Sequence, residues 1–541
     1  MPAIAEDTQM TRQPLDLTAE TDAMESYVAT FNRHDQELYR QHIPNGLAAA
    51  WMGDNIPLFE CPDKEIEEIY YFRWWTFRKH IKETPDGFVV TEFLPPVGWA
   101  GKHNTISCAA AHHYREGRWL RDARYLNDYA RFWLRGGGEV RTRIETNRGY
   151  SFWIADSLLA QARVSGQFEL CLDLLPDLIA NYEGWEREQR DPNGLFWQRD
   201  DRDGMEYSIA GKLSPNELGY RATINSYMFG DALAISEIAA RAGDAGCAER
   251  FRGKAAEIKR LTQEQLWDAE ARFFKVLPRV ENPTLSDARE LHGYTPWYFN
   301  LPDQDKSAAW AQLMDPKGFF APFGPTTAEQ RHREFRVVYM WKGCQWNGPS
   351  WPFSTSVTLT ALANLLNDYT QNTVTRKDYF DTLRIYARSH RLRLDDGREV
   401  PWIDENLNPF TGDWLTRTTK KRGLGTDSPG WADGAAEASK GEERGKDYNH
   451  STYCDLIING LVGLRPQSGE RIVVSPLVPE DWDYFRLDRI RYHGRDLAVL
   501  YDRTGKKYQR GKGLRLFCDG REIAGADALS RIAVELVQAT T

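Results

Sequence analysis

Apolar residues recur at three- and four-residue spacing from about residue 105 to 465, which is the period of helices with one buried face. One such stripe runs through Phe251, Ala255, Ile258 and Leu261. The segment Gly-Asp-Ala-Gly at 243–246 is a short break, so neighbouring helices are expected to pair as helical hairpins. The pattern predicts helices over 107–133, 150–166, 168–189, 222–242, 248–267, 354–367 and 377–389.

Long, turn-rich segments separate the helix pairs at 268–305, 315–340 and 404–447. Several distinctive motifs of the chain lie in or beside such loops, and chemistry is commonly placed on loops that a rigid scaffold holds. We therefore expect a mainly α fold, a toroid of helices with its functional site at one end. The stretch 417–447 is rich in Gly, Lys and Glu, and it reads equally well as a lid or as a surface loop.

The pattern changes after Arg465-Pro466 to short runs of β-forming residues separated by turns such as Cys518-Asp-Gly. The runs predict strands over 471–474, 487–492, 495–501 and 514–517. We expect three parts: a flexible N-terminal tail over 1–40, a helical domain over 41–466, and a small antiparallel, β-sandwich-like domain over 467–541. A packing role is expected for the last of these, because it places few acids beside aromatic residues.

The composition is that of a globular protein, with 541 residues, 41% hydrophobic and 27% charged. The net charge of -9 gives no reason to expect nucleic acid or an anionic membrane as a partner. No run approaches the roughly 20 apolar residues that span a bilayer, and the N-terminal sequence lacks the apolar core of a signal peptide. The 7 cysteines are scattered and form no CxxC pair, as in reduced cytoplasmic proteins. A cytoplasmic location is expected.

Sequence motifs for cofactor or metal chemistry are missing. The chain has no GxGxxG, P-loop, HExxH or GxSxG motif. His112 and His113 are neighbours within a predicted helix, so their side chains diverge and cannot share a metal. We expect neither a cofactor nor a metal. The composition stands out in its aromatic residues. The 19 Trp and 24 Tyr suit either a large core or platforms that stack on sugar rings.

Two acidic, turn-prone segments carry the best candidates for chemistry, since a pair of carboxylates is the usual equipment for cleaving a glycosidic bond. The first, 203–208, contains Glu206. Nearby aromatic residues and Asp203 would raise its pKa, as a general acid requires. The second, 404–409, holds Glu405 between Trp402 and Trp414, where an ionised carboxylate could act as general base. From composition alone, each reads more readily as an ordinary loop acid.

Further clusters combine aromatic rings with amide or basic groups, which suit ring stacking and hydroxyl recognition. They occupy 70–75, 98–104, 345–352 and 447–451. The alternative for 345–352 is a tight helix entry with buried Trp, and the alternative for a lone His is a structural role. The residues expected to bind substrate are Tyr71, Arg73, Trp74, Lys102, His103, Asn104, Asp203, Tyr207, Arg221, Asn225, Gln345, Trp346, Asn347, Trp351, Tyr448 and His450.

The order of these motifs resembles the six-hairpin glycosidases, in particular the clan of glycoside hydrolase family 63 and the mannosylglycerate-hydrolase-like domains. The family 63 pattern Gly-Met-Asp-Asn-Ser-Pro places its acid on Glu206, and Glu-Asn-Tyr-Asn-Pro-x-Thr-Gly places its base on Glu405. The pattern Trp-x-Gly-Pro-x-Trp-Pro falls on 346–352. The resemblance covers roughly residues 65 to 465. It implies an (α/α)6 barrel as the catalytic domain and an inverting hydrolase, and it selects Glu206 over Asp203 and Glu405 over Asp404.

The chain departs from the family 63 pattern in ways that bear on the substrate. Glu replaces Asp at the acid position, no Pro follows Ser208, and Arg-Trp-Trp at 73–75 stands where the family has Trp-Asp. The Asp-Gly-Met-Glu, His-Ser-Thr and Tyr-His-Gly segments are closer to the family 142 type of domain. That resemblance implies a β-L-arabinofuranosidase-like exo-activity.

The resulting prediction is an inverting exo-glycosidase that acts on a carbohydrate. Glu206 would protonate the leaving oxygen, Glu405 would activate water, and the two carboxyl groups should lie roughly 6.5–9.5 Å apart. Three alternatives remain. A sugar phosphorylase would need a phosphate site where Glu405 lies, and a sugar epimerase would rely on His103 and His450. The third is an inactive glycan-binding protein.

Overall fold

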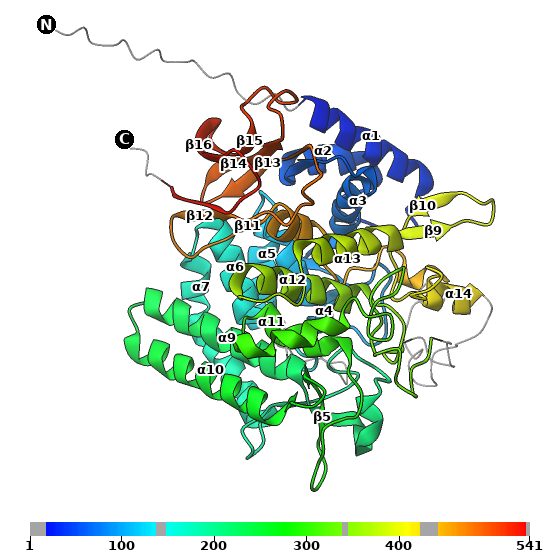
Figure 1. Cartoon of the computed structure of the whole chain (residues 1–541), viewed down its shortest axis with the longest axis vertical. Coiled ribbons are helices and arrows are strands. Elements are labelled where there is room, and N and C mark those ends of the chain that lie inside the picture. Colours follow the sequence, from blue (N-terminus) through cyan, green and yellow to red (C-terminus); the bar gives the residue numbers. More distant parts are fainter. Residues whose placement is uncertain (1–17, 137–147, 338–343, 422–441, 537–541) are drawn as a thin grey trace, which may run out of the picture.

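The computed structural model describes residues 18–136, 148–337, 344–421 and 442–536. Helices make up most of the described chain up to residue 421, and the longer strands follow residue 470 (Figure 1). The helices are α1 (Thr18–His34), α2 (Ala48–Asn55), α3 (Lys64–His80), α4 (Ser107–Gly117), α5 (Arg124–Arg131), α6 (Ile154–Ser165), α7 (Glu169–Asp173), α8 (Leu175–Gln189), α9 (Ala222–Arg241), α10 (Ala245–Gln265), α11 (Thr295–Tyr298), α12 (Pro352–Asp368), α13 (Arg376–Ser389) and α14 (Leu415–Lys421).

The helices follow one another around a ring. α4 packs on α6, α6 on α9, α9 on α11, and α11 on α12. α13 then packs on both α12 and α3, so the end of the series returns to its beginning. α9 and α10 form the predicted hairpin, and Asp244 caps α10 by accepting the N–H of Cys247 at 2.9 Å. The fold is the (α/α)6 toroid that the motif order implied.

Two helical regions differ from the sequence pattern. The helix predicted over 107–133 is divided into α4 and α5, because Arg118 and Trp119 both turn to bind the buried carboxylate of Asp455. Within the expected N-terminal tail, residues 18–34 form α1. Its buried Met24, Val28 and Phe31 recur at helical spacing and pack against α3, where Phe31 lies 5.5 Å from the ring of Phe72.

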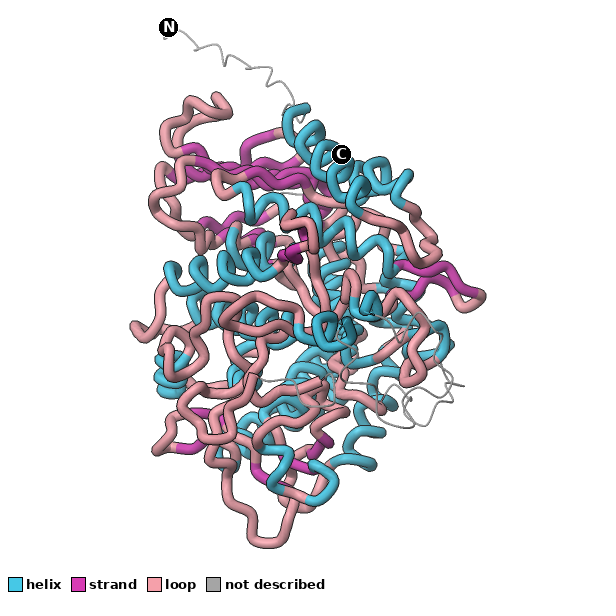
Figure 2. Tube along the Cα trace, turned by 90° about the vertical axis from the view of Figure 1, so that its right-hand side faces the viewer, coloured by secondary structure: helices cyan, strands magenta, loops and turns pink. Residues whose placement is uncertain are grey.

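The longer strands form a domain at the end of the chain, and they gather at one end of the molecule (Figure 2). Here β13 (Tyr484–Tyr492), β14 (Arg495–Asp502), β15 (Gly513–Cys518) and β16 (Arg521–Ala526) pair antiparallel in sequence order. β1 (Leu58–Glu60) completes this sheet by pairing with β13, so the domain takes one strand from far upstream. A second sheet has the order β11 (Leu464–Arg465), β12 (Arg471–Val474), β17 (Ile532–Glu535).

Short strands lie in the segments between the helices of the helical domain. These strands are β2 (Ile81–Thr84), β3 (Gly87–Val90), β4 (Trp197–Arg199), β5 (Leu218–Tyr220), β6 (Trp267–Asp268), β7 (Phe273–Phe274), β8 (Leu277–Pro278), β9 (Arg391–Arg393) and β10 (Glu399–Pro401). Within the described ranges they form three small antiparallel pairs and one triplet, which has the order β4-β5-β8.

Candidate active site

Loops from several helix pairs meet around a cavity, and Glu206 and Glu405 both lie on its wall. We refer to it as the Glu206–Glu405 cavity. Most of its wall is aromatic or apolar, with a few polar groups between the rings. It is lined by Glu92, Phe93, Trp99, Ile106, Cys108, Tyr150, Gly204, Glu206, Cys344, Trp346, Trp351, Phe353, Glu405, Arg444, Tyr448 and His450.

The loop that carries Glu206 is fixed from two sides. On one side, the buried carboxylate of Asp200 accepts the N–H of Ser208 at 3.0 Å and pairs with buried Arg221 at 2.5 Å. On the other side, the backbone carbonyl of Glu206 accepts the N–H of Trp346 at 3.1 Å. Tyr207 has a positive φ of 60°, which turns the chain sharply after the glutamate. The side chain of Glu206 is thereby held on the cavity wall.

The surroundings of Glu206 favour a protonated carboxyl group. Removal from water raises the pKa of Glu206 to about 8, and the negative charges of Asp201, Asp200 and Glu405 contribute to the increase. A carboxyl group with this pKa carries its proton at neutral pH. It can therefore donate that proton to a leaving oxygen, as a general acid must.

Glu405, in contrast to Glu206, lies beside a positively charged side chain. It is buried, and Arg444 donates from both Nε and Nη2 to its Oε1, with the Nε contact at 3.0 Å. Its Oε2 lies 3.4 Å from the hydroxyl of Thr416 and 3.7 Å from the thiol of Cys344. The guanidinium group lies where it can compensate the negative charge that a general base carries.

The neighbouring acids have structural roles and do not line the cavity. Asp203 accepts hydrogen bonds from the hydroxyls of Ser151, at 2.6 Å, and Thr223. Asp404 accepts the backbone N–H of Glu405 at 2.7 Å and packs against Gly445. Burial raises the pKa of both carboxyl groups, to about 7 for Asp404.

Two stacked indoles and a tyrosine–histidine pair form flat parts of the wall. Trp346 and Trp351 stack with ring centroids 4.6 Å apart, and the indole N–H of Trp351 donates to the carbonyl of Gln345 at 2.8 Å. Tyr448 meets His450 edge-on at 3.9 Å. Burial holds the pKa of His450 well below its usual range, so its ring is neutral and can hydrogen-bond a sugar hydroxyl.

The structure brings Trp346, Trp351, Tyr448 and His450 to the cavity with the two glutamates, and it places the other predicted binding residues elsewhere. Tyr71 and Trp74 are core residues, while Arg73 binds Ser451 and Tyr386. Lys102 and His103 both pair with Asp86. The side chain of Asn104 forms hydrogen bonds with the backbone of its own loop. The side chain of Asn225 donates a hydrogen bond to the backbone carbonyl of Phe196. Arg221 and Asp203 hold the Glu206 loop, and Tyr207, Gln345 and Asn347 adjoin residues of the wall.

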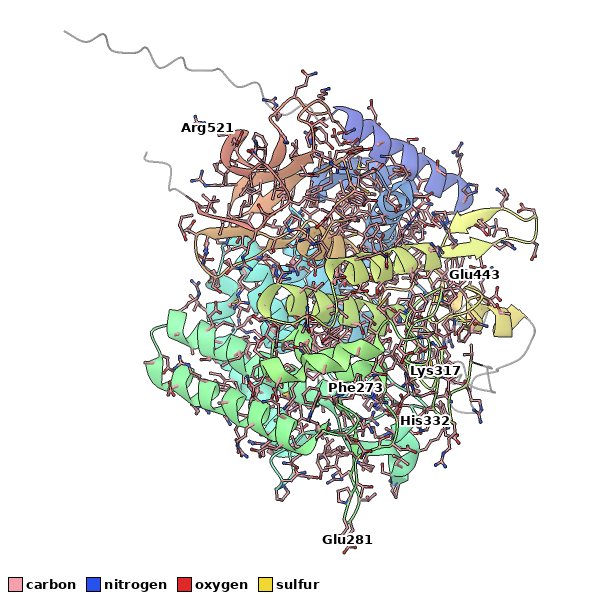
Figure 3. All side chains as sticks on the ribbon, in the orientation of Figure 1. Phe273, Glu281, Lys317, His332, Glu443 and Arg521 are labelled. Atoms are coloured by element: carbon pink, nitrogen blue, oxygen red, sulfur yellow. The ribbon has the colours of Figure 1, made fainter. Side chains whose placement is uncertain are left out.

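Glu92 and Arg444 are the charged lining residues that sequence reasoning missed. Glu92 follows a strand-like Val-Val-Thr run, and Arg444 lies in the Gly-, Lys- and Glu-rich stretch 417–447. That stretch was expected to be a lid or a surface loop, and its residues 422–441 lie outside the described part. Its last residues, beginning near Glu443, lie close to α14 (Figure 3), and Glu443 pairs with Arg417 at 2.6 Å. Trp99, beside the noted 98–104 cluster, is a further aromatic lining residue.

Metal-binding and membrane-spanning features are both missing from the described ranges. No group of three or more His, Cys, Asp or Glu in these ranges is arranged to hold a metal ion. None of their helices is both long and apolar enough to cross a membrane.

Comparison with known proteins connects this geometry to a family. The model of the mannosylglycerate hydrolase MGH1-like glycoside hydrolase domain matches residues 102–451, which include Glu206, Glu405 and Arg444. The model of the glycosyl hydrolase family 65 C-terminal domain matches residues 464–524, in the β-domain.

Solved structures share the architecture. A protein named as a sialidase is 42% identical with a TM-score of 0.85, and the match covers 95% of this chain and 44% of that one. This chain therefore spans less than half the length of that protein. A family GH78 rhamnosidase from a Bacillus species is 13% identical with a TM-score of 0.50, covering 85% and 41%. The GH63 mannosylglycerate hydrolase from Thermus thermophilus is 14% identical with a TM-score of 0.45, covering 60% and 94%.

The family match extends over most of the helical domain and includes both glutamates of the cavity. The chain belongs to the mannosylglycerate hydrolase MGH1-like glycoside hydrolases.

Proposed function

We propose that this protein is an inverting exo-glycosidase, with Glu206 as general acid and Glu405 as general base. One observation supports the proposal above all. Two glutamates on the wall of one cavity have opposite electrostatic surroundings, since burial keeps Glu206 protonated while Arg444 stabilises the charge of Glu405. An acid and a base at the same pH are what glycoside inversion requires.

In the proposed reaction the terminal sugar lies between the two carboxyl groups. Glu206 transfers its proton to the glycosidic oxygen as the bond to the anomeric carbon breaks. Glu405 takes a proton from a water molecule that attacks the opposite face of that carbon. The products are a free alcohol and a sugar of inverted configuration. Arg444 holds the Glu405 carboxylate in place through two donors on one oxygen.

The wall of the cavity supports a sugar as the ligand. It is mostly aromatic or apolar, and the stacked pair Trp346 and Trp351 offers a flat face to a sugar ring. The Asp-Gly-Met-Glu segment that carries Glu206 makes a β-L-arabinofuranoside the first substrate to test. Likeness to a protein named as a sialidase adds sialosides to the same panel.

A panel of aryl glycosides that includes furanosides, pyranosides and a sialoside tests the activity. NMR of the first sugar released should show the anomer opposite to that of the substrate. Phosphate should not be required, because an acid and not a phosphate site lies at the Glu405 position. Retained configuration would overturn the inverting mechanism, and a strict need for phosphate would indicate a phosphorylase.

Substitution of each glutamate tests the roles separately. Glu405→Gln should lower kcat by about 10²–10⁴-fold on every substrate, because an amide cannot accept the proton of water. Glu206→Gln should lower kcat as strongly on poor leaving groups and only weakly on dinitrophenyl glycosides, which leave without protonation. Full activity of Glu405→Gln, or an equal loss on all leaving groups for Glu206→Gln, would contradict the assignment.

A further inference from the structure

Glu92 is a third carboxyl group on the wall of the Glu206–Glu405 cavity. It comes from the segment that follows β3, far from both glutamate motifs in sequence. Its backbone carbonyl accepts the N–H of Asn449 at 3.0 Å, and the Asn449 side chain donates to the carbonyl of Thr91 at 3.2 Å. These bonds fasten the Glu92 segment to the segment that carries Tyr448 and His450.

The carboxyl group of Glu92 is deeply buried, yet it has few hydrogen-bond partners. The residue is 4% exposed, and the hydroxyl of Tyr448 donates to its Oε1 at 2.5 Å. Within the described ranges, Oε2 accepts no hydrogen bond from the protein. Burial raises the pKa of Glu92 to about 8, and the charge of Glu405 adds to the increase. At neutral pH the group therefore offers both an O–H donor and an acceptor.

Glu116 shows how a buried carboxylate with a structural role is bonded in this protein. It is 1% exposed and accepts the backbone N–H groups of Tyr453, Cys454 and Asp455 at 2.8–3.2 Å. Both of its oxygens are used in this way. The Glu92 carboxyl group accepts one hydrogen bond, whereas the Glu116 carboxylate accepts several. A ligand in the cavity can supply the hydrogen bonds that the Glu92 carboxyl group still lacks.

We propose that Glu92 and Tyr448 bind a hydroxyl group of the terminal sugar, which makes Glu92 a specificity-determining residue of this site. The inference rests on the proposed glycosidase function. It also limits the substrate class. The cation on the described wall of the cavity, Arg444, is already paired with Glu405, so the site suits an uncharged sugar rather than one bearing a carboxylate.

The kinetic test uses the aryl glycoside that wild type cleaves fastest, together with its monodeoxy analogues. At one ring position, loss of the hydroxyl should lower the kcat/KM of wild type about 10–100-fold, as expected for a hydrogen bond to a buried polar group. In Glu92→Ala, loss of the same sugar hydroxyl should change kcat/KM less than threefold. In Glu92→Gln, loss of that hydroxyl should still lower kcat/KM by much of the wild-type factor. Equal losses in wild type and Glu92→Ala at every ring position would overturn the inference.

A binding measurement separates this inference from the proposed function. Saturation-transfer NMR with free neutral monosaccharides needs no turnover. Wild type and the control Glu83→Ala, whose side chain is largely exposed on the hairpin before Glu92, should bind alike, and Glu92→Ala should bind at least tenfold more weakly. Binding that depends on Glu92 without any hydrolysis would refute only the glycosidase proposal. Equal binding by all three proteins, or no binding by wild type, would refute the role of Glu92.

Discussion

Two glutamates of one cavity have different surroundings because, among the described residues, a cation pairs with Glu405 and none pairs with Glu206. Glu206 is surrounded by further negative charge, whereas Glu405 receives two donors from Arg444. The difference between the proposed acid and the proposed base thus comes from neighbouring side chains and not from the glutamates themselves. Two residue-scale predictions follow from those neighbours.

The activity should decline at alkaline pH because Glu206 must carry a proton. The pKa of Glu206 is raised to about 8, so its protonated fraction is nearly complete at pH 7 and falls about tenfold for each pH unit above 8. We expect kcat/KM on a substrate with a poor leaving group to follow that fall. The same profile with a dinitrophenyl glycoside should be flatter at high pH. An alkaline limb that starts near pH 5 would contradict the raised pKa.

Arg444→Met should impair the proposed base. Without the guanidinium, the charge of buried Glu405 is no longer compensated, and its carboxylate loses two donors that hold it in place. We expect kcat at neutral pH to fall about tenfold or more. Arg398→Met is the matched control, since Arg398 pairs with Asp396 at an exposed position. An unchanged kcat would argue against this role.

At the scale of elements, helices were easier to predict than the residues between them. The α9–α10 hairpin, α12 and α13 follow from apolar spacing, because each buries one regular face. The division between α4 and α5 could not be predicted, since it depends on Asp455, more than three hundred residues away.

The residues of the cavity, too, could be predicted only where they lie in a sequence motif. Glu206 and Glu405 lie in turn motifs with recognisable order, and Trp346 and Trp351 lie in another. Glu92 and Arg444 belong to no motif, and only the folded toroid brings them to the wall. The basic and aromatic clusters at 70–75 and 98–104 suggested binding, but Arg73 and Asn104 use their polar groups to hold the scaffold together.

The turn that delivers Arg444 depends on a glycine. A Cβ at Gly445 would overlap the Asp404 carboxylate, so Gly445→Ala should push the Glu442–Gly445 turn away from Glu405. We expect a loss of kcat similar to that of Arg444→Met, with a small change in the thermal midpoint. Gly253→Ala is the control, because a Cβ there meets nothing within 4 Å and alanine favours the helix. Full activity of Gly445→Ala would show that Arg444 does not need this turn.

At the scale of the whole molecule, the two domains are joined at several points. β1 precedes the helical ring in sequence but belongs to the sheet of β13–β16, and α1 lies at the same end (Figure 1). Buried Arg486 pairs with Glu20 of α1 at 2.9 Å and with Asp488 at 2.8 Å. The β-domain is therefore a structural partner of the N-terminal helices, which fits the packing role expected from its sequence.

Arg486→Met should weaken the whole fold. It would leave the carboxylates of Glu20 and Asp488 buried without their cation, which is expected to lower the free energy of unfolding by about 3–5 kcal/mol. Arg503→Met removes an exposed pair with Asp483 and should lower it by less than about 1 kcal/mol. Urea denaturation followed by circular dichroism measures both. Equal effects of the two substitutions would contradict the structural role of the buried pair.

The thiol of Cys344 gives the cavity a position for covalent labelling that requires no engineered residue. Six of the seven cysteines are buried, while Cys344 is partly exposed on the cavity wall. Burial, with the charges of Glu206 and Glu405, raises the pKa of its thiol well above the usual range, so common alkylating reagents will react slowly. A mercurial, which binds thiols strongly, would place its adduct beside both glutamates. Protection from that reagent would then report the occupancy of the cavity, even by ligands that are never cleaved.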